Sequence, residues 1–267
     1  MANLRADLAI TSLDAMTAYG ITSNEFLFQL DELQNVTIDN AEEKVDITGK
    51  QGRKLNSLKR NKTVTISGTN GTLNGGLMEM QTGSEFVTKD NAKVRWVDQL
   101  EVTTNSATTT WKAVGTTGNE IIALYVKNEN GTLGTKLEQD ASAAEGKFAY
   151  APATKALTFA ANELADGTEI VVFYERALQA DVLENQSDTY STKCKLYIDA
   201  TAEDGCANQY HVQIFIPKAD FDGNFSLEMG DNQTVQNFNA ESLAGACGAS
   251  GSLWTYTVFG ANEADAE

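Results

Sequence analysis

The sequence predicts a mainly β protein: a β core with one short helix and an inserted or extended β-meander. Short runs rich in Thr, Val, Ile and aromatic residues alternate apolar and polar side chains, which is the period of half-buried strands. The chain has 21 glycines and 2 prolines, so glycine turns join these runs. With 267 residues, 42% of them hydrophobic, it is long enough to bury such a core.

The first strand signals lie between residues 26 and 38. Phe26, Phe28 and Leu30 recur at every second position, and this alternation then loses phase at Asp31 and Glu32 before it resumes. A phase slip of this kind indicates a β-bulge or a tight turn.

Residues 44–62 form a basic polar segment in a chain whose formal net charge is -17. Six of its cations are candidates for binding a partner: Lys50, Arg53, Lys54, Lys59, Arg60 and Lys62. Single exposed ion pairs contribute little, but a cluster of charges can set the register and orientation of a partner. We therefore predict an inter-subunit loop that binds acidic neighbouring copies. The simpler alternative is a solvated loop that keeps the chain soluble.

A strand and then a helix follow this segment. Alternation places Val64 and Ile66 on a core-facing side. The sequence next predicts a weak helix over 72–81, with Thr72 as its cap and Gly83 as its end. Three apolar residues at helical spacing mark its buried side, namely Leu73, Leu77 and Met80.

Residues 104–178 differ from both flanking segments in their pattern of short strands and turns, which predicts a self-contained β-meander. Hairpin signals stand at Asn130 and Gly131 and around Pro152. Because the flanking segments are also rich in strands, we expect one core built from residues 1–103 and 179–267. Residues 104–178 are then an inserted β-rich segment, for which an Ig-like domain is one reading.

The last predicted hairpin, residues 225–241, has one apolar face and one acidic, amide-rich face. Alternation places these polar residues together: Ser226, Glu228, Asn237, Asn239 and Glu241.

No arrangement of residues points to catalysis, to a metal or to a cofactor. His211 is the only histidine, which excludes zinc sites with several His ligands. The three cysteines are odd in number and lack Cys-x-x-Cys spacing, so they predict neither a disulfide framework nor a zinc knuckle: Cys194, Cys206 and Cys247. Nucleophile-elbow and phosphate-loop motifs are also missing from the sequence. We expect a protein that is not an enzyme.

The composition limits the partners. A sequence pI near 4.4 disfavours tight binding of nucleic acid through released counterions. Asp7 and Asp14 interrupt the apolar core that a secretory signal needs, and no later run has membrane-spanning length. We therefore expect a protein that is made in a cytoplasm and does not insert into a membrane.

Two stretches carry a resemblance to a known family. VDITGKQGRKLNSLKRNKTVTISGTNGTLNGGLMEMQTG and, more loosely, PKADFDGNFSLEMGDNQTVQNFNAESLAG resemble tail tube (major tail) proteins of long-tailed bacteriophages. The resemblance implies a tail-tube-type β-sandwich or barrel core whose copies close into hexameric rings, and rings that stack into a hollow tube for DNA ejection. It also implies that a loop matching residues 44–62 reaches the neighbouring subunit or ring, and that the helix matches residues 72–81.

The same resemblance implies the partners and the place of action. The partners are further copies of the chain, a tape-measure protein, a tail terminator and baseplate or distal tail proteins. The protein is then part of the virion tail, assembled in the cytoplasm of the bacterial host. Since an acidic lumen repels DNA phosphates and lets the genome slide, we predict that the polar face of the last hairpin lines the channel.

Two other functions fit the sequence. One is a virion or surface adhesion module that binds host glycans through residues 104–178. The aromatic platforms that sugar binding needs have no clear counterpart, because Trp96, Trp111 and Trp254 are read as separate core residues. The other is the inner tube of a contractile tail or a related injection machine.

Overall fold

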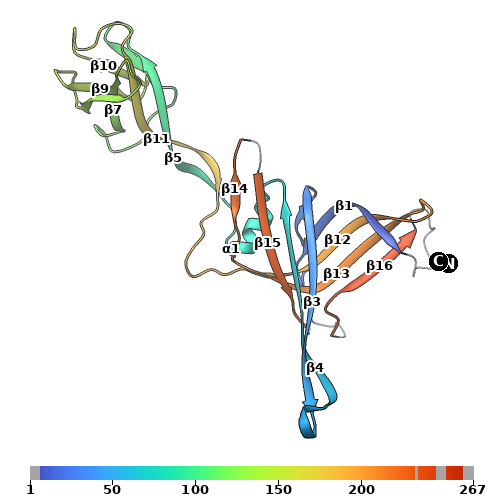
Figure 1. The fold of residues 1–267 in the computed structure, drawn as a ribbon. Coiled ribbons are helices and arrows are strands. Elements are labelled where there is room, and N and C mark those ends of the chain that lie inside the picture. The colour runs from blue at the N-terminus through green and yellow to red at the C-terminus, as the bar shows by residue number, and fades with distance from the viewer. Residues whose placement is uncertain (1–6, 232–233, 245–250, 261–267) are drawn as a thin grey trace. The chain divides into compact units, whose positions relative to one another are not determined.

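The computed structural model describes residues 7–231, 234–244 and 251–260 and divides the chain into two compact units. The first unit consists of Met1–Phe86 and Leu183–Glu267, and the second of Val87–Val182 (Figure 1). Strands dominate both units, so the predicted mainly β class is confirmed. The predicted segment 104–178 lies inside the second unit, and its limits as a separate domain stay a prediction.

The first unit is built on one antiparallel sheet of nine strands that curls into a half-barrel (Figure 1). The strand order is β2-β1-β12-β13-β15-β4-β3, with β14 paired to β15 and β16 to β13. The bounds are β1 (Leu8–Tyr19), β2 (Phe26–Leu30), β3 (Leu33–Thr48), β4 (Lys54–Asn70), β12 (Lys193–Asp204), β13 (Gln209–Phe221), β14 (Leu227–Met229), β15 (Thr234–Ser242) and β16 (Thr255–Gly260).

One face of this sheet, which we call the core face, is buried inside the curl of the sheet, where helix α1 (Gly75–Thr82) packs against it. Leu77 of the helix is fully buried and packs with the core face, whose residues include Met16, Ala18, Val64, Ile66, Leu196, Ile198, Phe238 and Ala240. Each fully buried large apolar side chain contributes about 1.5–3 kcal/mol. The predicted core-facing positions of the strand after the basic segment are confirmed. The alternate residues of these strands occupy the opposite side, which we call the open face.

Helix α1 begins three residues later than the sequence predicts. The Asn74 side chain caps it by accepting a hydrogen bond from the backbone N–H of Leu77 at 3.0 Å. Thr72 is not the cap, because its backbone and hydroxyl oxygens accept hydrogen bonds from Asn70 Nδ2 at 2.7 and 3.0 Å. Gly83 ends the helix as predicted, in the left-handed conformation with φ of 70°.

Two glutamines tie α1 to β15. The backbone N–H of Asn74 donates to Gln236 Oε1 at 2.7 Å, and Gln236 Nε2 donates to Gln81 Oε1 at 3.2 Å. Gln81 Nε2 in turn donates to the backbone oxygen of Asn237 at 2.8 Å. Because both glutamine side chains are buried, losing one partner would leave the other unsatisfied, so these bonds fix the helix on the sheet.

The predicted basic loop is wrong in its secondary structure, because most of it belongs to a long hairpin. Strands β3 and β4 pair from Leu33 and Asn70 out to Thr48 and Lys54, with a short 3₁₀ turn, η1 (Lys50–Gly52), at the end. Charged side chains project from both strands while the backbone groups pair. We call residues 41–62 the arm (Figure 1). The phase slip at Asp31 and Glu32, predicted to be a β-bulge or a tight turn, is the two-residue connection between β2 and β3, which stand at opposite ends of the strand order.

The second unit holds a seven-stranded sheet in the order β5-β11-β7-β8-β9-β10-β6. The bounds are β5 (Val87–Glu101), β6 (Ser106–Thr108), β7 (Ile121–Lys127), β8 (Leu133–Gln139), β9 (Lys147–Ala151), β10 (Ala156–Phe159) and β11 (Glu169–Val182). The hairpin signals at Asn130 and Gly131 and around Pro152 are confirmed, because they lie between β7 and β8 and between β9 and β10.

The interpretation of Trp96 and Trp111 as separate core residues is wrong. Their rings meet edge to face with centroids 6.4 Å apart, and both remain partly exposed. The Arg176 guanidinium lies 4.0 Å from the Trp111 ring centroid and 5.1 Å from that of Trp96. Asp98, which is buried beside them, accepts hydrogen bonds from Trp96 Nε1 at 2.9 Å and from the Tyr174 hydroxyl at 2.8 Å. Cation–π attraction brings together residues far apart in sequence.

We expect Gly83→Ala to destabilise the first unit. A Cβ at this position would lie 1.9 Å from the Tyr190 carbonyl oxygen, in addition to the cost of about 1–2 kcal/mol for a left-handed alanine. Gly52→Ala is the matched control, since φ there is +73° and nothing lies within 4 Å of the added Cβ. Denaturant unfolding should show a clearly larger loss for Gly83→Ala, and equal losses would contradict the contact.

Candidate functional site

The arm carries its charges as a partly internal network. Three of its cations form ion pairs with carboxylates of the same arm: Lys54 with Asp46 at 2.6 Å, Lys59 with Glu42 at 2.8 Å and Arg60 with Glu43 at 2.7 Å. The side-chain hydrogen bond from Lys59 lowers the pKa of Glu42, and the same bond raises the pKa of Lys59. These pairs hold the two strands in register and leave fewer cations for a partner.

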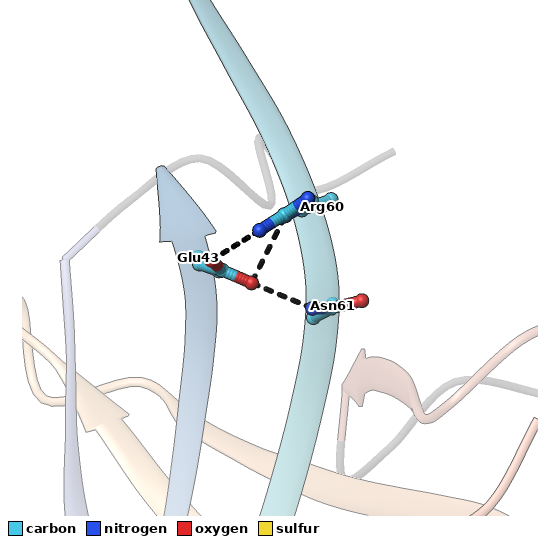
Figure 2. A network of polar contacts seen from close by, with 3 residues as sticks. All are labelled: Glu43, Arg60 and Asn61. Atoms are coloured by element: carbon cyan, nitrogen blue, oxygen red, sulfur yellow. Dashed lines mark hydrogen bonds and ion pairs between the residues drawn. The ribbon is translucent and has the colours of Figure 1, made fainter. Parts of the chain in front are cut away.

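Glu43 is the most highly bonded carboxylate of the arm (Figure 2). Arg60 binds it through two donors, Nη2 at 2.7 Å from Oε1 and Nε at 3.1 Å from Oε2. Asn61 Nδ2 donates to Oε2 at 2.6 Å. The hydrogen bonds from Arg60 and then Asn61 lower the pKa of Glu43 below its ordinary value. This fork fixes Arg60 to its own strand pair.

The end of the arm presents unpaired positive charge. Lys50 and Arg53 form no ion pair within the described residues, and both are exposed. The whole arm has seven cations against three carboxylates. Of the predicted inter-subunit cations, Lys50 and Arg53 at the end of the arm and Lys62 at its base have no ion pair among the described residues, whereas Lys54, Lys59 and Arg60 are already engaged.

The predicted polar face of the last hairpin lies on the open face. Asn237, Asn239 and Glu241 alternate with buried core residues along β15. Glu228 shares their face, since it lies opposite Val235 in the β14 pairing. The backbone N–H of Ser226 donates to Asn237 Oδ1 at 2.6 Å. The structure thus brings together all five predicted polar residues.

The pairing register extends this polar surface across four strands. Asp39 of β3, Thr65 of β4, Glu241 of β15 and Asp220 of β13 occupy successive partner positions on the open face. Asp220 forms an ion pair with Lys193 at 3.3 Å. Asp39 and Asp220 were not singled out from the sequence, because only the sheet order places them beside the last hairpin.

Aromatic rings cover the other part of the open face. Phe26, Tyr19, Tyr197 and Phe215 come from β2, β1, β12 and β13, with successive ring centroids 6.0, 5.7 and 4.6 Å apart. We call these four residues the aromatic row. Each comes from a different strand, so no single stretch of sequence contains a signal for it.

The described residues contain no group of three or more His, Cys, Asp or Glu side chains that would hold a metal ion. His211 packs against the Phe259 ring, with centroids 5.5 Å apart. Burial raises the pKa of the Cys194 thiol to about 12, Cys206 is exposed, and Cys247 lies outside the described residues. In the described part of the chain, no helix has both the length and the apolar character to cross a membrane.

A comparison with protein-family models matches residues 8–255 to the YomU/Tube protein family. The matched range includes the arm, helix α1, the aromatic row and the polar face of the last hairpin, and it spans both units. No curated protein matches the chain.

We expect Arg60→Gln to raise the pKa of Glu43 toward its ordinary value, because the largest cause of its lowering is removed. In the native chain this ion pair stabilises the arm above the pKa of the unfolded state, and the contribution is lost as the pH falls through the lowered pKa. NMR titration of the carboxyl groups measures the pKa of Glu43 in the native chain and in the variant. Glu42, which is paired with Lys59, is the internal control and should not change. If the pKa of Glu43 were the same in the variant, the two hydrogen bonds from Arg60 would be contradicted.

Proposed function

Because the chain belongs to the YomU/Tube protein family, a family of structural phage tail tube proteins, we propose that its copies close into hexameric rings that stack into a hollow tube. DNA passes through this tube during ejection. The observation that carries the proposal is the family match over residues 8–255, on a chain whose first unit is one curled sheet.

The edges of the nine-stranded sheet support closure into a ring. Among the described residues, β2 pairs only with β1 and β3 pairs only with β4. A long strand with unpaired N–H and C=O groups invites pairing with another chain, and closing the sheets of several copies into one ring removes these edges. We propose that the edge of one copy meets the opposite edge of the next. Such a heterologous contact closes a ring when its rotation is right.

The acidic part of the open face supports a role as the lining of the channel. Glu228, Glu241, Asp39 and Asp220 lie there among amide and hydroxyl groups. Carboxylates repel phosphates, whereas a basic lining would hold DNA through many released counterions. We propose that DNA slides past this surface without binding tightly.

The arm supports a contact between copies. Outside the arm, the first unit has twenty-one acidic and four basic residues, so a neighbouring copy presents a strongly negative surface to the cations of the arm. We propose that Lys50 and Arg53 meet this surface and that their charge orients the approaching copy.

The remaining partners follow from this role. We propose contacts with a tape-measure protein inside the tube and with terminator and baseplate or distal tail proteins at its ends, with assembly in the cytoplasm of the bacterial host. The alternative of a glycan-binding adhesion module gains no support from Trp96 and Trp111. The guanidinium of Arg176 lies over both rings, where a sugar would stack.

Negative-stain microscopy of the concentrated protein tests the proposal. Stacked rings with a central hole are expected. Small particles of uniform size at every concentration, with no rings, would overturn it.

The lining is tested by reversing its charge. We expect Glu228→Lys with Glu241→Lys to leave tubes intact but to slow DNA ejection, because the added cations attract phosphates. Ejection is followed by dye fluorescence from triggered virions, and the delay should shrink as salt is raised. Glu101→Lys with Glu129→Lys in the second unit gives the same change in net charge as a control. Unchanged ejection in the first variant would remove the assignment of the lining.

The arm is tested at its end. We expect Lys50→Ser with Arg53→Ser to slow assembly and to weaken its dependence on salt, since these cations form no ion pair with any described residue. Light scattering follows the rate. Lys112→Ser with Lys136→Ser removes two exposed cations of the second unit and should leave the rate unchanged. Normal assembly with normal salt sensitivity in the arm variant would contradict the role of the arm cations.

A further inference from the structure

The arm carries apolar side chains that the described chain does not cover. Ile47 is 41% exposed, Leu55 58% and Leu58 54%. The arm begins where β15 stops pairing with β4, at Thr65, and from there only β3 and β4 pair with each other. At about 3.3 Å per residue, a strand from Asn40 to Thr48 extends roughly 25 Å.

A two-stranded hairpin of this kind is at best marginally stable alone in water. Val45 lies opposite Leu58 in the pairing, and Ile47 is on the same side of β3, so these three form an apolar side of the arm. The ion pairs between the strands are exposed and contribute little. Packing of this apolar side against another surface would bury it and so stabilise the hairpin.

The aromatic row is a second apolar surface that the described residues leave partly exposed. Phe26 at its edge is 58% exposed, and the Tyr197 and Phe215 rings are stacked with an angle of 27° between their planes. On the same face lie two carboxylates: Asp199, which accepts from Gln213 Nε2 at 2.8 Å, and Asp14, which accepts from the Thr201 hydroxyl at 2.8 Å. The border of the row thus holds these two carboxylates and one cation, Lys195, which lies opposite Tyr19 in the β1–β12 pairing and donates a hydrogen bond to Asn24 Oδ1.

We propose that the arm of one copy packs on the aromatic row of a neighbouring copy. The proposal rests on the proposed function, in which copies assemble, and it names the surface that receives the arm. Ile47 and Leu58 meet the rings, while Lys50 and Arg53 reach the carboxylates of the border. Apolar burial supplies the affinity, and the charges select the orientation.

The second unit has another exposed apolar surface, but its charges fit the arm less well. Arg95 forms an ion pair with Glu175 at 3.8 Å, and Lys127 with Glu169 at 2.8 Å. The surface thus has no unpaired acidic border for the cations of the arm. Its exposed apolar residues are Val97, Ile122 and Leu133.

The contact is heterologous, because the arm and the row are different surfaces of each copy. Two complementary variants therefore test it. An arm variant, Ile47→Ser with Leu58→Ser, keeps an intact row, and a row variant, Tyr19→Ser with Phe26→Ser, keeps an intact arm. Circular dichroism and thermal melting confirm that each is folded.

We expect neither variant to assemble alone and the two to form a 1:1 complex when mixed, because one intact arm then meets one intact row and no second contact between an arm and a row follows. Native mass spectrometry measures the complex. A mixture that stays monomeric while the wild-type chain assembles would overturn the proposal, as would assembly of either variant at the wild-type rate. A wild-type chain that forms no rings would instead count against the proposed function, whatever the mixture does.

A third variant separates the two candidate surfaces. Val97→Ser with Leu133→Ser removes the apolar surface of the second unit and should assemble like the wild-type chain. If it fails to assemble but forms a 1:1 complex with the arm variant, the second unit receives the arm and the aromatic row does not.

Discussion

Burial of the core face beneath helix α1 is the interaction on which the rest of the first unit depends. Leu77 and Met80 cover the sheet, and Gln81 and Gln236 satisfy each other in the buried layer between helix and strand. Because strand side chains alternate, fixing one face as core assigns every neighbouring position to the open face. Packing of the core face therefore also places the acidic residues and the aromatic row on the open face.

The open face and the arm differ in how they are held. Residues on the open face lie on strands whose other side is buried, so their positions are set by the core. The arm has no core of its own, and its strands are held by backbone pairing and exposed ion pairs. The aromatic row and the arm are complementary in two respects. Both have an apolar side, and the carboxylates beside the row are opposite in charge to the cations of the arm. This division suits a protein whose family builds tubes from its own copies.

Two errors of the sequence-based predictions have identifiable physical causes. Thr72 has the residue type of a helix cap, but Asn70 binds it outside the helix and Asn74 takes its place. The basic segment has the composition of a loop. It forms strands because the backbone groups of β3 and β4 form hydrogen bonds with each other. This pairing between two segments cannot be predicted from the composition of either one.

The mainly β class, the position of the short helix to within a few residues, the break after β2 and the polar side of the last hairpin could all be predicted from the sequence. Each depends on the spacing of residues within one short stretch. Only the tertiary structure decided that Asp39 and Asp220 extend this polar side, that four rings from four strands form one row, and that Arg176 joins Trp96 to Trp111. Sheet order and register place these residues side by side, and both are set by packing between segments far apart in the chain.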